Sequence, residues 1–261
     1  MKISIIITAE NKEKYIERAI LSCLNQNFKN FEIIVVYSKL YNQFLLEKKF
    51  EKKIRFLKTK KIKSPIHDQI YKINKGVLVS SGKFICLLDG DDVFKKNKLF
   101  NIFSNRENSS IIIDKYELIV NDKKIKNHYR KNLFKESDIY KIIMNPWPKN
   151  ICTSTISVKR EQLLEFFKKV NYWQYNFLAI DILLVIYFLN KIKNINKYLT
   201  VKYNYNKNLD TRFVGFRNWK YWSRRYEQFC FFESLNKTSS LSYSLDKLVT
   251  KIVFFFLKKF T

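Results

Sequence analysis

Glycine-rich nucleotide-binding loops are missing from this sequence, which contains only four glycines and three prolines among 261 residues. Neither a GxGxxG pattern nor a P-loop lysine motif occurs, which argues against a dinucleotide-dependent enzyme and against an ATPase. Internal repeats and long low-complexity linkers are missing as well. A chain of this length is typical of one large domain, or of one domain with an elaborated tail.

Cysteines and long apolar runs are also scarce. The four cysteines are scattered without a CxxC pair, so we expect neither zinc nor a disulfide scaffold, but reduced thiols in a cytosolic protein. The first residues turn polar too early for a secretory signal. The longest apolar run, 182–189, is well short of the ~20 residues that span a bilayer. We therefore expect a cytoplasmic protein, either soluble or peripheral at the inner face of the cell membrane.

Acidic residues are outnumbered, with 23 Asp and Glu against 50 Lys and Arg, a formal net charge of +27. Such a balance favours anionic partners: nucleic acid, a membrane surface or phosphorylated substrates. The sequence is also rich in Lys, Asn, Ile, Phe and Tyr, a bias that an AT-rich genome produces without any function. Both interpretations of the charge stay open. Hydrophobic residues make up 46% of the chain, which is enough for a substantial core.

The first hundred residues have the pattern of a parallel α/β sheet. Compact β-branched runs predict buried strands at 2–8 and 31–37, and the segment 12–26 between them has helical spacing of its apolar residues. A third strand is expected at Ile54–Leu57, a helix at 65–80 and a fourth strand at 83–89. Strand, helix and strand within about 35 residues indicate a βαβ unit.

The remainder is more mixed. We expect helices at 95–105, 160–170 and 176–192, strands at 110–120 and 152–159, and a polar loop over 121–150. The tail from 210 onward is rich in aromatic and basic residues.

Three carboxylates follow the fourth strand, in the segment Asp89-Gly90-Asp91-Asp92. Ligands of open α/β sheets bind at the carboxyl ends of the strands, and clustered carboxylates are relieved by a divalent cation such as Mg²⁺ or Mn²⁺. Magnesium commonly takes one or two carboxylates together with substrate phosphates, so the pattern suggests a metal that bridges a diphosphate. The alternative is a solvated turn whose acids cap the next helix.

Two long segments, "IIITAENKEKYIERAILSCLNQNFKNFEIIVV" and "IHDQIYKINKGVLVSSGKFICLLDGDD", carry a family resemblance. In order and spacing they resemble the family-two glycosyltransferases over roughly the first 95 residues. The resemblance implies a GT-A fold: a Rossmann-like, mainly parallel sheet flanked by helices, here with a helical, basic-aromatic extension. It divides the chain into a glycosyltransferase domain at 1–209 and an extension at 210–261. Within the domain, residues 1–95 form the nucleotide-sugar-binding half and residues 96–209 the acceptor-binding half.

The resemblance also implies an activity. It predicts a metal-dependent, inverting transferase that moves a sugar from a nucleotide-sugar, with UDP as the favoured nucleotide, to a saccharide or glycolipid acceptor. The pathway implied is bacterial surface-glycan (lipopolysaccharide- or capsule-type polysaccharide) biosynthesis. Asp89, Gly90 and Asp91 form the DXD motif, in which Asp89 and Asp91 ligate Mg²⁺ or Mn²⁺ and Asp89 also lies near the ribose. Asp92 either assists them or caps the next helix.

Further positions follow from the same resemblance. The turn at Thr8, Ala9 and Glu10 should lie under the nucleotide, and Asp68 and Asn74 should line the nucleotide and diphosphate region. For Asn74 a structural place on a helix face, beside a closely packed glycine, is an equal alternative.

The catalytic base is expected at Asp181, the single acid ahead of a long apolar run. A carboxylate there would remove the acceptor proton, and burial would raise its pKa toward a useful range. The alternative is an N-cap that serves the helix, and the two roles are compatible.

The sequence departs from the family after Val36, where acids that contact the nucleotide base are usual and Tyr37, Ser38 and Lys39 stand instead. Tyr37 either stacks on the base or packs in the core. Late in the chain Asn206 replaces a usual histidine, and Arg212 or Arg217 is a substitute phosphate ligand by residue type. These departures leave a second hypothesis: a catalytically degenerate GT-A module that binds anionic membrane or nucleic acid.

The extension at 210–261 interleaves Arg, Lys, Trp, Tyr and Phe. Basic-aromatic helices of this kind lie in a bilayer interface and are attracted to anionic lipid. The alternatives are a helical pair that packs on the catalytic domain, or an oligomer interface. Nucleic-acid binding uses the same residue types, but no RRM, KH or helix-turn-helix motif supports it.

Overall fold

The computed structural model describes residues 1–9, 14–39, 43–50, 54–107, 109–121, 123–125, 151–204, 218–235 and 241–259. Its strands are β1 (Ile3–Ala9), β2 (Phe31–Tyr37), β3 (Arg55–Lys58), β4 (Phe84–Asp89), β5 (Val93–Phe94), β6 (Ile111–Val120), β7 (Lys123–Ile125), β8 (Ile156–Lys159) and β9 (Ile192–Asn204). The described residues join them into one sheet of order β3-β2-β1-β4-β8-β6-β9-β5, with β7 paired to β6.

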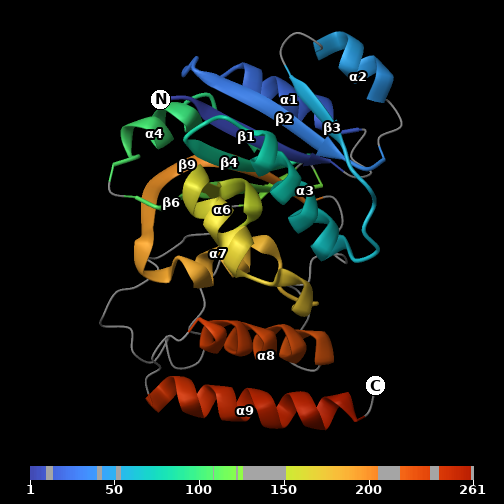
Figure 1. Cartoon of the computed structure of the whole chain (residues 1–261), viewed down its shortest axis with the longest axis vertical. Coiled ribbons are helices and arrows are strands. Elements are labelled where there is room, and N and C mark those ends of the chain that lie inside the picture. Colours follow the sequence, from blue (N-terminus) through green and yellow to red (C-terminus); the bar gives the residue numbers. More distant parts are fainter. Residues whose placement is uncertain are drawn as a thin grey trace.

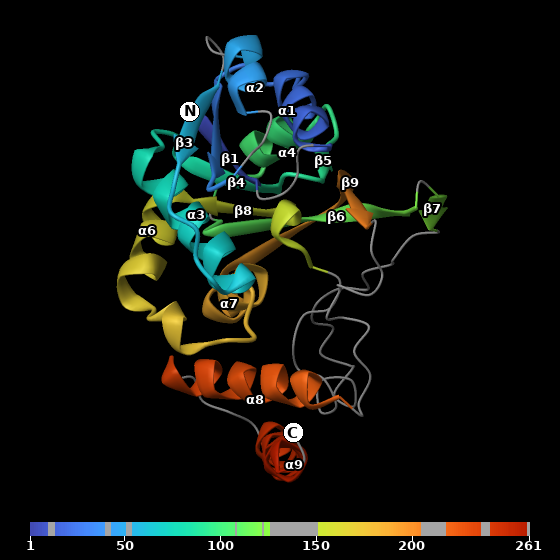
Figure 2. The same cartoon turned by 90° about the vertical axis from the view of Figure 1, so that its right-hand side faces the viewer.

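Helices cover both faces of this sheet (Figures 1 and 2). They are α1 (Ile16–Leu24), α2 (Gln43–Phe50), α3 (Pro65–Val79), α4 (Lys98–Ser104), α6 (Arg160–Lys169), α7 (Ile180–Tyr187), α8 (Trp219–Ser234) and α9 (Leu241–Lys258). Short 3₁₀ turns are η1 (Thr153–Thr155), η2 (Tyr172–Gln174) and η3 (Leu189–Lys191). The arrangement confirms the expected GT-A class, and helices α8 and α9 confirm that the extension is helical.

The core lies in two layers because neighbouring residues of a strand point to opposite faces of the sheet. Ile5 and Ile7 pack with α1, α2 and α4, whereas Ile6 packs with α3, α6, α7 and α8. Strands β1, β2 and β4 of the all-parallel half are buried along most of their length, which explains their continuous apolar runs, whereas the edge strand β3 is exposed at both ends.

The order of these strands decides where a ligand site can form. From β1 the chain winds outward through β2 and β3, and α3 then returns it to β4 on the other side of β1. Such a reversal opens a crevice at the carboxyl ends of the two strands. Thr8 of β1 pairs in register with Asp89 of β4, so both strands end at this crevice.

Three expectations for the second half were wrong. Strand β7 lies near the start of the polar loop expected over 121–150, the rest of which lies outside the described residues. The helix expected at 176–192 ends at Tyr187, and the chain then enters the sheet as β9, parallel to β6. Residues 152–159 form a strand only in their second half, because η1 occupies the first. The expected strands at 31–37 and 110–120 and the helix at 65–80 are confirmed within one residue at either end.

Candidate active site

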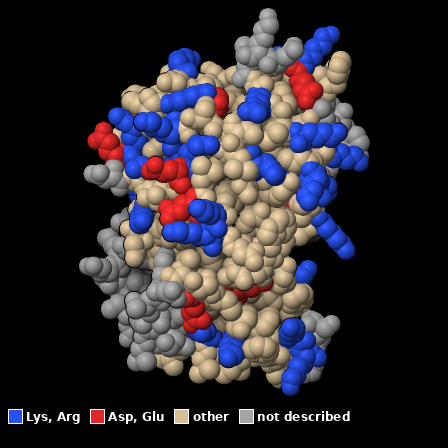
Figure 3. Space-filling view, in the orientation of Figure 1, with Lys and Arg blue, Asp and Glu red and all other residues tan. Residues whose placement is uncertain are grey.

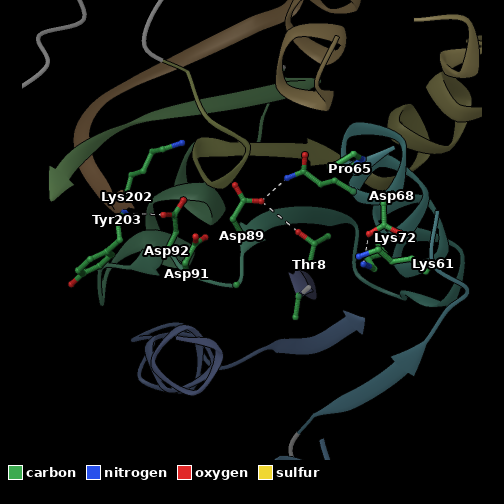
Figure 4. A pocket seen from close by; sticks show the side chains of 13 residues that line it. Thr8, Lys61, Pro65, Asp68, Lys72, Asp89, Asp91, Asp92, Lys202 and Tyr203 are labelled. Carbon is green, nitrogen blue, oxygen red and sulfur yellow. Dashed lines mark hydrogen bonds and ion pairs between the residues drawn. The ribbon is translucent and has the colours of Figure 1, made fainter. Parts of the chain in front are cut away.

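The three aspartates lie at the mouth of a cavity of about 430 Å³ at the crevice between β1 and β4. Side chains from β1, α3, the β4–β5 connection and β9 converge on it (Figure 4). The lining residues are Thr8, Ala9, Lys61, Pro65, Asp68, Gln69, Lys72, Asp89, Gly90, Asp91, Asp92, Lys202 and Tyr203. Predicted residues from three separate stretches of sequence are thereby brought together.

Asp89 is held in place from two elements. Its Oδ1 accepts a hydrogen bond from Gln69 Nε2 at 2.7 Å and a longer one from Thr8 Oγ1 at 3.4 Å. The backbone N–H of Gly90 donates to the Thr8 carbonyl at 3.0 Å, which fixes the turn after β4 against β1. The orientation of the Asp89 carboxylate is therefore set before any ligand binds.

Asp91 is anchored through its backbone instead. Arg18 of α1 donates from Nη2 to the Asp91 carbonyl at 2.9 Å, and its guanidinium lies 3.5 Å from the centre of the Tyr203 ring. Helix α1 and strand β9 thus clamp the acidic turn from two sides. The Asp91 side chain belongs to the cavity lining.

Asp92 is buried, and the expectation that it caps the next helix was wrong because the N-cap of α4 is Asn97. Its carboxylate accepts from Ser154 Oγ at 2.6 Å and from the Tyr203 backbone N–H at 3.0 Å. Burial raises the pKa of Asp92 to about 7; the charge of Lys202 opposes the rise, and those of Asp91 and Asp89 add to it. The turn therefore carries a concentration of negative charge.

Lysines line the cavity at both ends, with Lys61 and Lys72 together at one end and Lys202 beside Asp92 at the other (Figure 4). The buried Lys72 of α3 forms an ion pair with Asp68 at 2.5 Å, and the other oxygen of Asp68 accepts from the Ile62 backbone N–H at 2.8 Å. Lys61 and Lys202 add further positive charge at the lining. Acidic and basic groups thus line one cavity. Such a lining suits an anion that binds together with a divalent cation.

Several predicted residues do not line the cavity. Tyr37 is buried in the core, where its hydroxyl donates to Glu47 at 3.0 Å, so its packing role is confirmed and its stacking role was wrong. Asn74 is not part of the cavity lining and hydrogen-bonds the hydroxyl of Tyr172, which favours its structural alternative. Glu10, like Asn206, Arg212 and Arg217, lies outside the described residues.

Asp181 lies in the first turn of α7, and its Oδ1 accepts from the Ile182 backbone N–H at 2.8 Å. It is not the N-cap, which is Ala179, so that alternative was wrong. Asp181 is absent from the described lining of the cavity. The buried thiol of Cys152 has a pKa raised to about 12 by burial, with Lys202 opposing and Asp92, Asp89 and Asp181 contributing.

Sequence reasoning missed Ser154, Lys202 and Tyr203. Ser154 comes shortly after residues 126–150, which the structure does not describe, and the other two belong to β9, in a segment where no strand was expected. The alternation of "YLTVKYN" at 198–204 was the available signal for a strand.

The donor set fits a divalent cation in part. Asp89 and Asp91 offer hard carboxylate oxygens in a turn with excess negative charge. Among the described residues no three or more candidate ligand side chains gather at one point, so a complete protein cage is not formed there. Two carboxylates plus phosphate oxygens are the typical environment of Mg²⁺.

Comparison with known proteins identifies the family. The model for "Glycosyl transferase family 2" matches residues 4–166, well over half of the chain. This chain belongs to glycosyl transferase family 2. The match spans β1 to α6 and therefore includes the acidic turn and Ser154.

Relatives of this family-two chain are named glycosyltransferases. An "Uncharacterized glycosyltransferase" of Haemophilus influenzae is 28% identical over 186 residues, which cover 65% of this chain and 56% of that protein. Another, of Rickettsia bellii, is 36% identical over 101 residues, 38% of this chain and 14% of that protein. The chain thus spans little more than half of the length of the first relative and far less of the second.

Solved structures share the fold at low identity. The fragment 1–349 of S. aureus TarS aligns with a TM-score of 0.63 at 17% identity, covering 97% of this chain and 69% of that one. Its complex with UDP-GlcNAc gives 0.62 at 16%, covering 97% and 70%. The mannosyltransferase PcManGT from Pyrobaculum calidifontis, in complex with GDP-Man and Mn²⁺, gives 0.56 at 12%, covering 95% and 68%.

Proposed function

We propose that this chain is a metal-dependent, inverting glycosyltransferase that uses a nucleotide-sugar donor. One observation carries the proposal: Asp89, Asp91 and Asp92 share a cavity with lysines at the switch point of the sheet. Family membership and relatives named glycosyltransferases support the same activity. Without a cation the acidic turn concentrates negative charge where an anionic donor has to bind, and that is the physical reason for the metal.

In this proposal Asp89 and Asp91 would hold Mg²⁺ or Mn²⁺ together with the donor diphosphate. When bound, the cation neutralises the diphosphate as it leaves. Thr8 and Ala9 lie below the nucleotide, and Lys72 and Lys202 offset phosphate charge from opposite sides of the cavity. Asp68 holds Lys72 and the Ile62 backbone in place, which is a positioning role.

Inversion needs a base on the acceptor side of the donor sugar. The acceptor hydroxyl oxygen forms a bond to the anomeric carbon as the bond to the diphosphate oxygen breaks, and the bonding pair leaves with the diphosphate. The hydroxyl proton passes to the Asp181 carboxylate. The charges of Asp181, Asp89 and Asp92 all contribute to the raised pKa of the Cys152 thiol. This common effect supports the assignment.

UDP is the favoured nucleotide, and a saccharide or glycolipid in surface-polysaccharide biosynthesis is the proposed acceptor. Two neighbouring structures carry UDP-GlcNAc and GDP-Man, respectively, so the fold accommodates more than one nucleotide. Tyr37 replaces the usual acid after Val36 and is buried, so contacts to the base must come from other residues. We assign these contacts to Lys61 and the backbone of Ala9, which line the cavity.

We extend the proposal to peripheral contact with the inner face of the cell membrane, where a glycolipid acceptor would be presented. Among the described helices, none is both long and apolar enough to cross a bilayer. Contact through helices α8 and α9 would therefore be at the surface.

The proposal is tested by thermal unfolding with UDP, GDP, CMP and dTDP compounds, each with and without Mn²⁺. We expect one nucleotide to stabilise the protein in a metal-dependent manner, because ligands that bind only the folded state raise its stability. Asp91→Asn should lose this stabilisation and at least 100-fold of transfer activity, roughly the effect of removing one charge-stabilising group.

The matched control is Glu107→Gln, which removes an exposed carboxylate at the end of α4, away from the cavity. It should keep both nucleotide binding and transfer. Equal transfer by Asp91→Asn and Glu107→Gln would refute the metal site. Stabilisation by no nucleotide, together with salt-sensitive binding of DNA or anionic vesicles, would instead favour the degenerate binding module.

A further inference from the structure

Helix α9 presents an apolar face to solvent. Leu245, Leu248, Val249, Ile252, Phe255 and Phe256 are each 46–61% exposed. Their spacing of three and four residues places them in one row along the helix. In Figures 1 and 2 the helix lies at the end of the molecule farthest from the sheet, with α8 between it and the core.

The opposite face of α9 is fixed to α8 by specific contacts. Arg225 of α8 donates from Nη2 to Asp246 and from Nε to Thr250 Oγ1, the latter at 3.0 Å. Tyr226 stacks on Phe254 with ring centres 4.8 Å apart. Because Asp246, Thr250 and Phe254 recur every four residues, they define the inner face, and the apolar row must point outward.

The charges on α9 and on the whole chain distinguish between an anionic partner and a second copy of the chain at the outward face. Exposed Lys251 and Lys258 lie beside the apolar row and Lys259 continues it, whereas the single acid of α9, Asp246, is turned inward to Arg225. A second copy of the chain would bring a net charge of +27 against another +27. One row of six side chains is also far smaller than the roughly 20–30 residues per side of a stable interface.

We infer that the outward face of α9 is a membrane-docking surface for anionic lipid. The helix would lie in the plane of the interface with its apolar row among the acyl chains and the lysines at the headgroups. The inference deepens the membrane part of the proposed function by assigning it to named residues. Its test involves no glycosyl transfer, so either proposal can fail alone.

The whole chain of 261 residues is sedimented with vesicles of phosphatidylcholine alone and of phosphatidylcholine mixed with phosphatidylglycerol. We expect binding to the anionic vesicles and weak binding to the neutral ones. The triple variant Leu248→Gln, Ile252→Gln, Phe255→Gln should bind the anionic vesicles roughly tenfold or more weakly, because the apolar row supplies the insertion. Lys251→Gln with Lys259→Gln should lose the preference for phosphatidylglycerol.

The matched control is Phe44→Gln with Leu45→Gln, an even more exposed apolar pair on α2. It should bind the vesicles like the unchanged protein. Circular dichroism and the metal-dependent nucleotide shift should be unaltered in all variants, since none of these residues lines the cavity. Three results would each overturn the inference: no vesicle binding, equal binding of both vesicle types, or a dimer that the triple variant abolishes in the absence of vesicle binding.

Discussion

At the scale of single residues, Ser154 connects the acidic turn to the interior. Its Oγ donates to Asp92 at 2.6 Å and accepts from the Asp89 backbone N–H at 3.0 Å. Its carbonyl accepts from Lys98 Nζ at 2.9 Å and from Thr200 Oγ1 at 3.1 Å. One residue thus joins two of the three aspartates to a buried network.

That network contains a fully buried ion pair. Lys98 of α4 donates to Asp114 of β6, and Thr200 of β9 donates to the other carboxylate oxygen at 2.8 Å. A buried pair of this kind adds little net stability, but the loss of one partner is costly. The pair therefore holds η1, β6 and β9 in a fixed relation behind the acidic turn.

We predict that Ser154→Ala loses about 1–3 kcal/mol of unfolding free energy, because the Asp92 carboxylate and the Asp89 N–H each lose a partner. The donor KM should rise more than kcat falls, since Ser154 positions the turn and does not touch the reacting atoms. Chemical denaturation and steady-state kinetics measure the two effects.

Ser157→Ala is the comparison for this substitution. Ser157 is equally buried in β8, but its Oγ contacts Cys86 Sγ at 3.3 Å instead of an aspartate. A donor KM that changes to the same extent in both variants would show that Ser154 is only a packing residue.

At the scale of elements, the connection between α3 and β4 sets the position of the acidic turn. Gly82 lies there against β1, and a Cβ at this position would be 2.5 Å from the Ser4 backbone nitrogen. Its own N–H donates to Ser4 Oγ at 2.8 Å. The close approach of two backbones is the reason that glycine is required.

Gly82→Ala should therefore destabilise the fold by at least about 1–3 kcal/mol, the usual cost of overpacking. Gly76→Ala in α3 should cost less. Its Cβ would meet the Ile6 Cγ2 methyl at 2.8 Å, which a side chain can partly relieve, and alanine regains about 1 kcal/mol of helix propensity. Urea denaturation gives both values, and the reverse order would contradict the steric argument.

At the scale of the whole molecule, charge is the dominant feature. Lys and Arg side chains are spread over the sheet-containing part of the visible face, and acidic side chains gather in few places (Figure 3). With a net charge of +27 the folded state repels itself, and salt screens that repulsion.

We predict that raising sodium chloride from about 0.05 M to about 0.3 M increases the melting temperature by a few degrees. For a chain of this size, 1 kcal/mol of unfolding free energy corresponds to about 2–4 °C of melting temperature. Circular dichroism in a buffer free of phosphate measures the change, because phosphate could bind at the cavity. A lower melting temperature in salt would mean that attractive ion pairs outweigh the net repulsion.

The stack of helices is likewise a property of the whole. Helix α8 packs on α7 and α9 packs on α8, so the extension lies on the second half of the sheet and not beside the donor cavity. This arrangement separates the proposed membrane surface from the proposed chemistry. A glycolipid headgroup would have to reach along the molecule from α9 to Asp181.

The sequence by itself determined the parallel half of the sheet and the position of the acidic turn. Long β-branched runs and a periodic helix leave few alternatives over residues 1–95, and their order identifies the family. The carboxylate cluster at a strand end suggested Asp89 and Asp91, the family resemblance added Thr8, Ala9, Asp68 and Gly90, and all six line the one cavity.

Only the tertiary structure decided the rest. β9 pairs with β6 across about 80 residues of chain, and that pairing, not local propensity, makes it a strand and brings Lys202 and Tyr203 to the cavity. The burial of Tyr37 and the contact of Asn74 with Tyr172 depend on which face of an element meets its neighbour. Local sequence patterns specify the individual helices and strands, whereas long-range packing decides which of their side chains meet at one site.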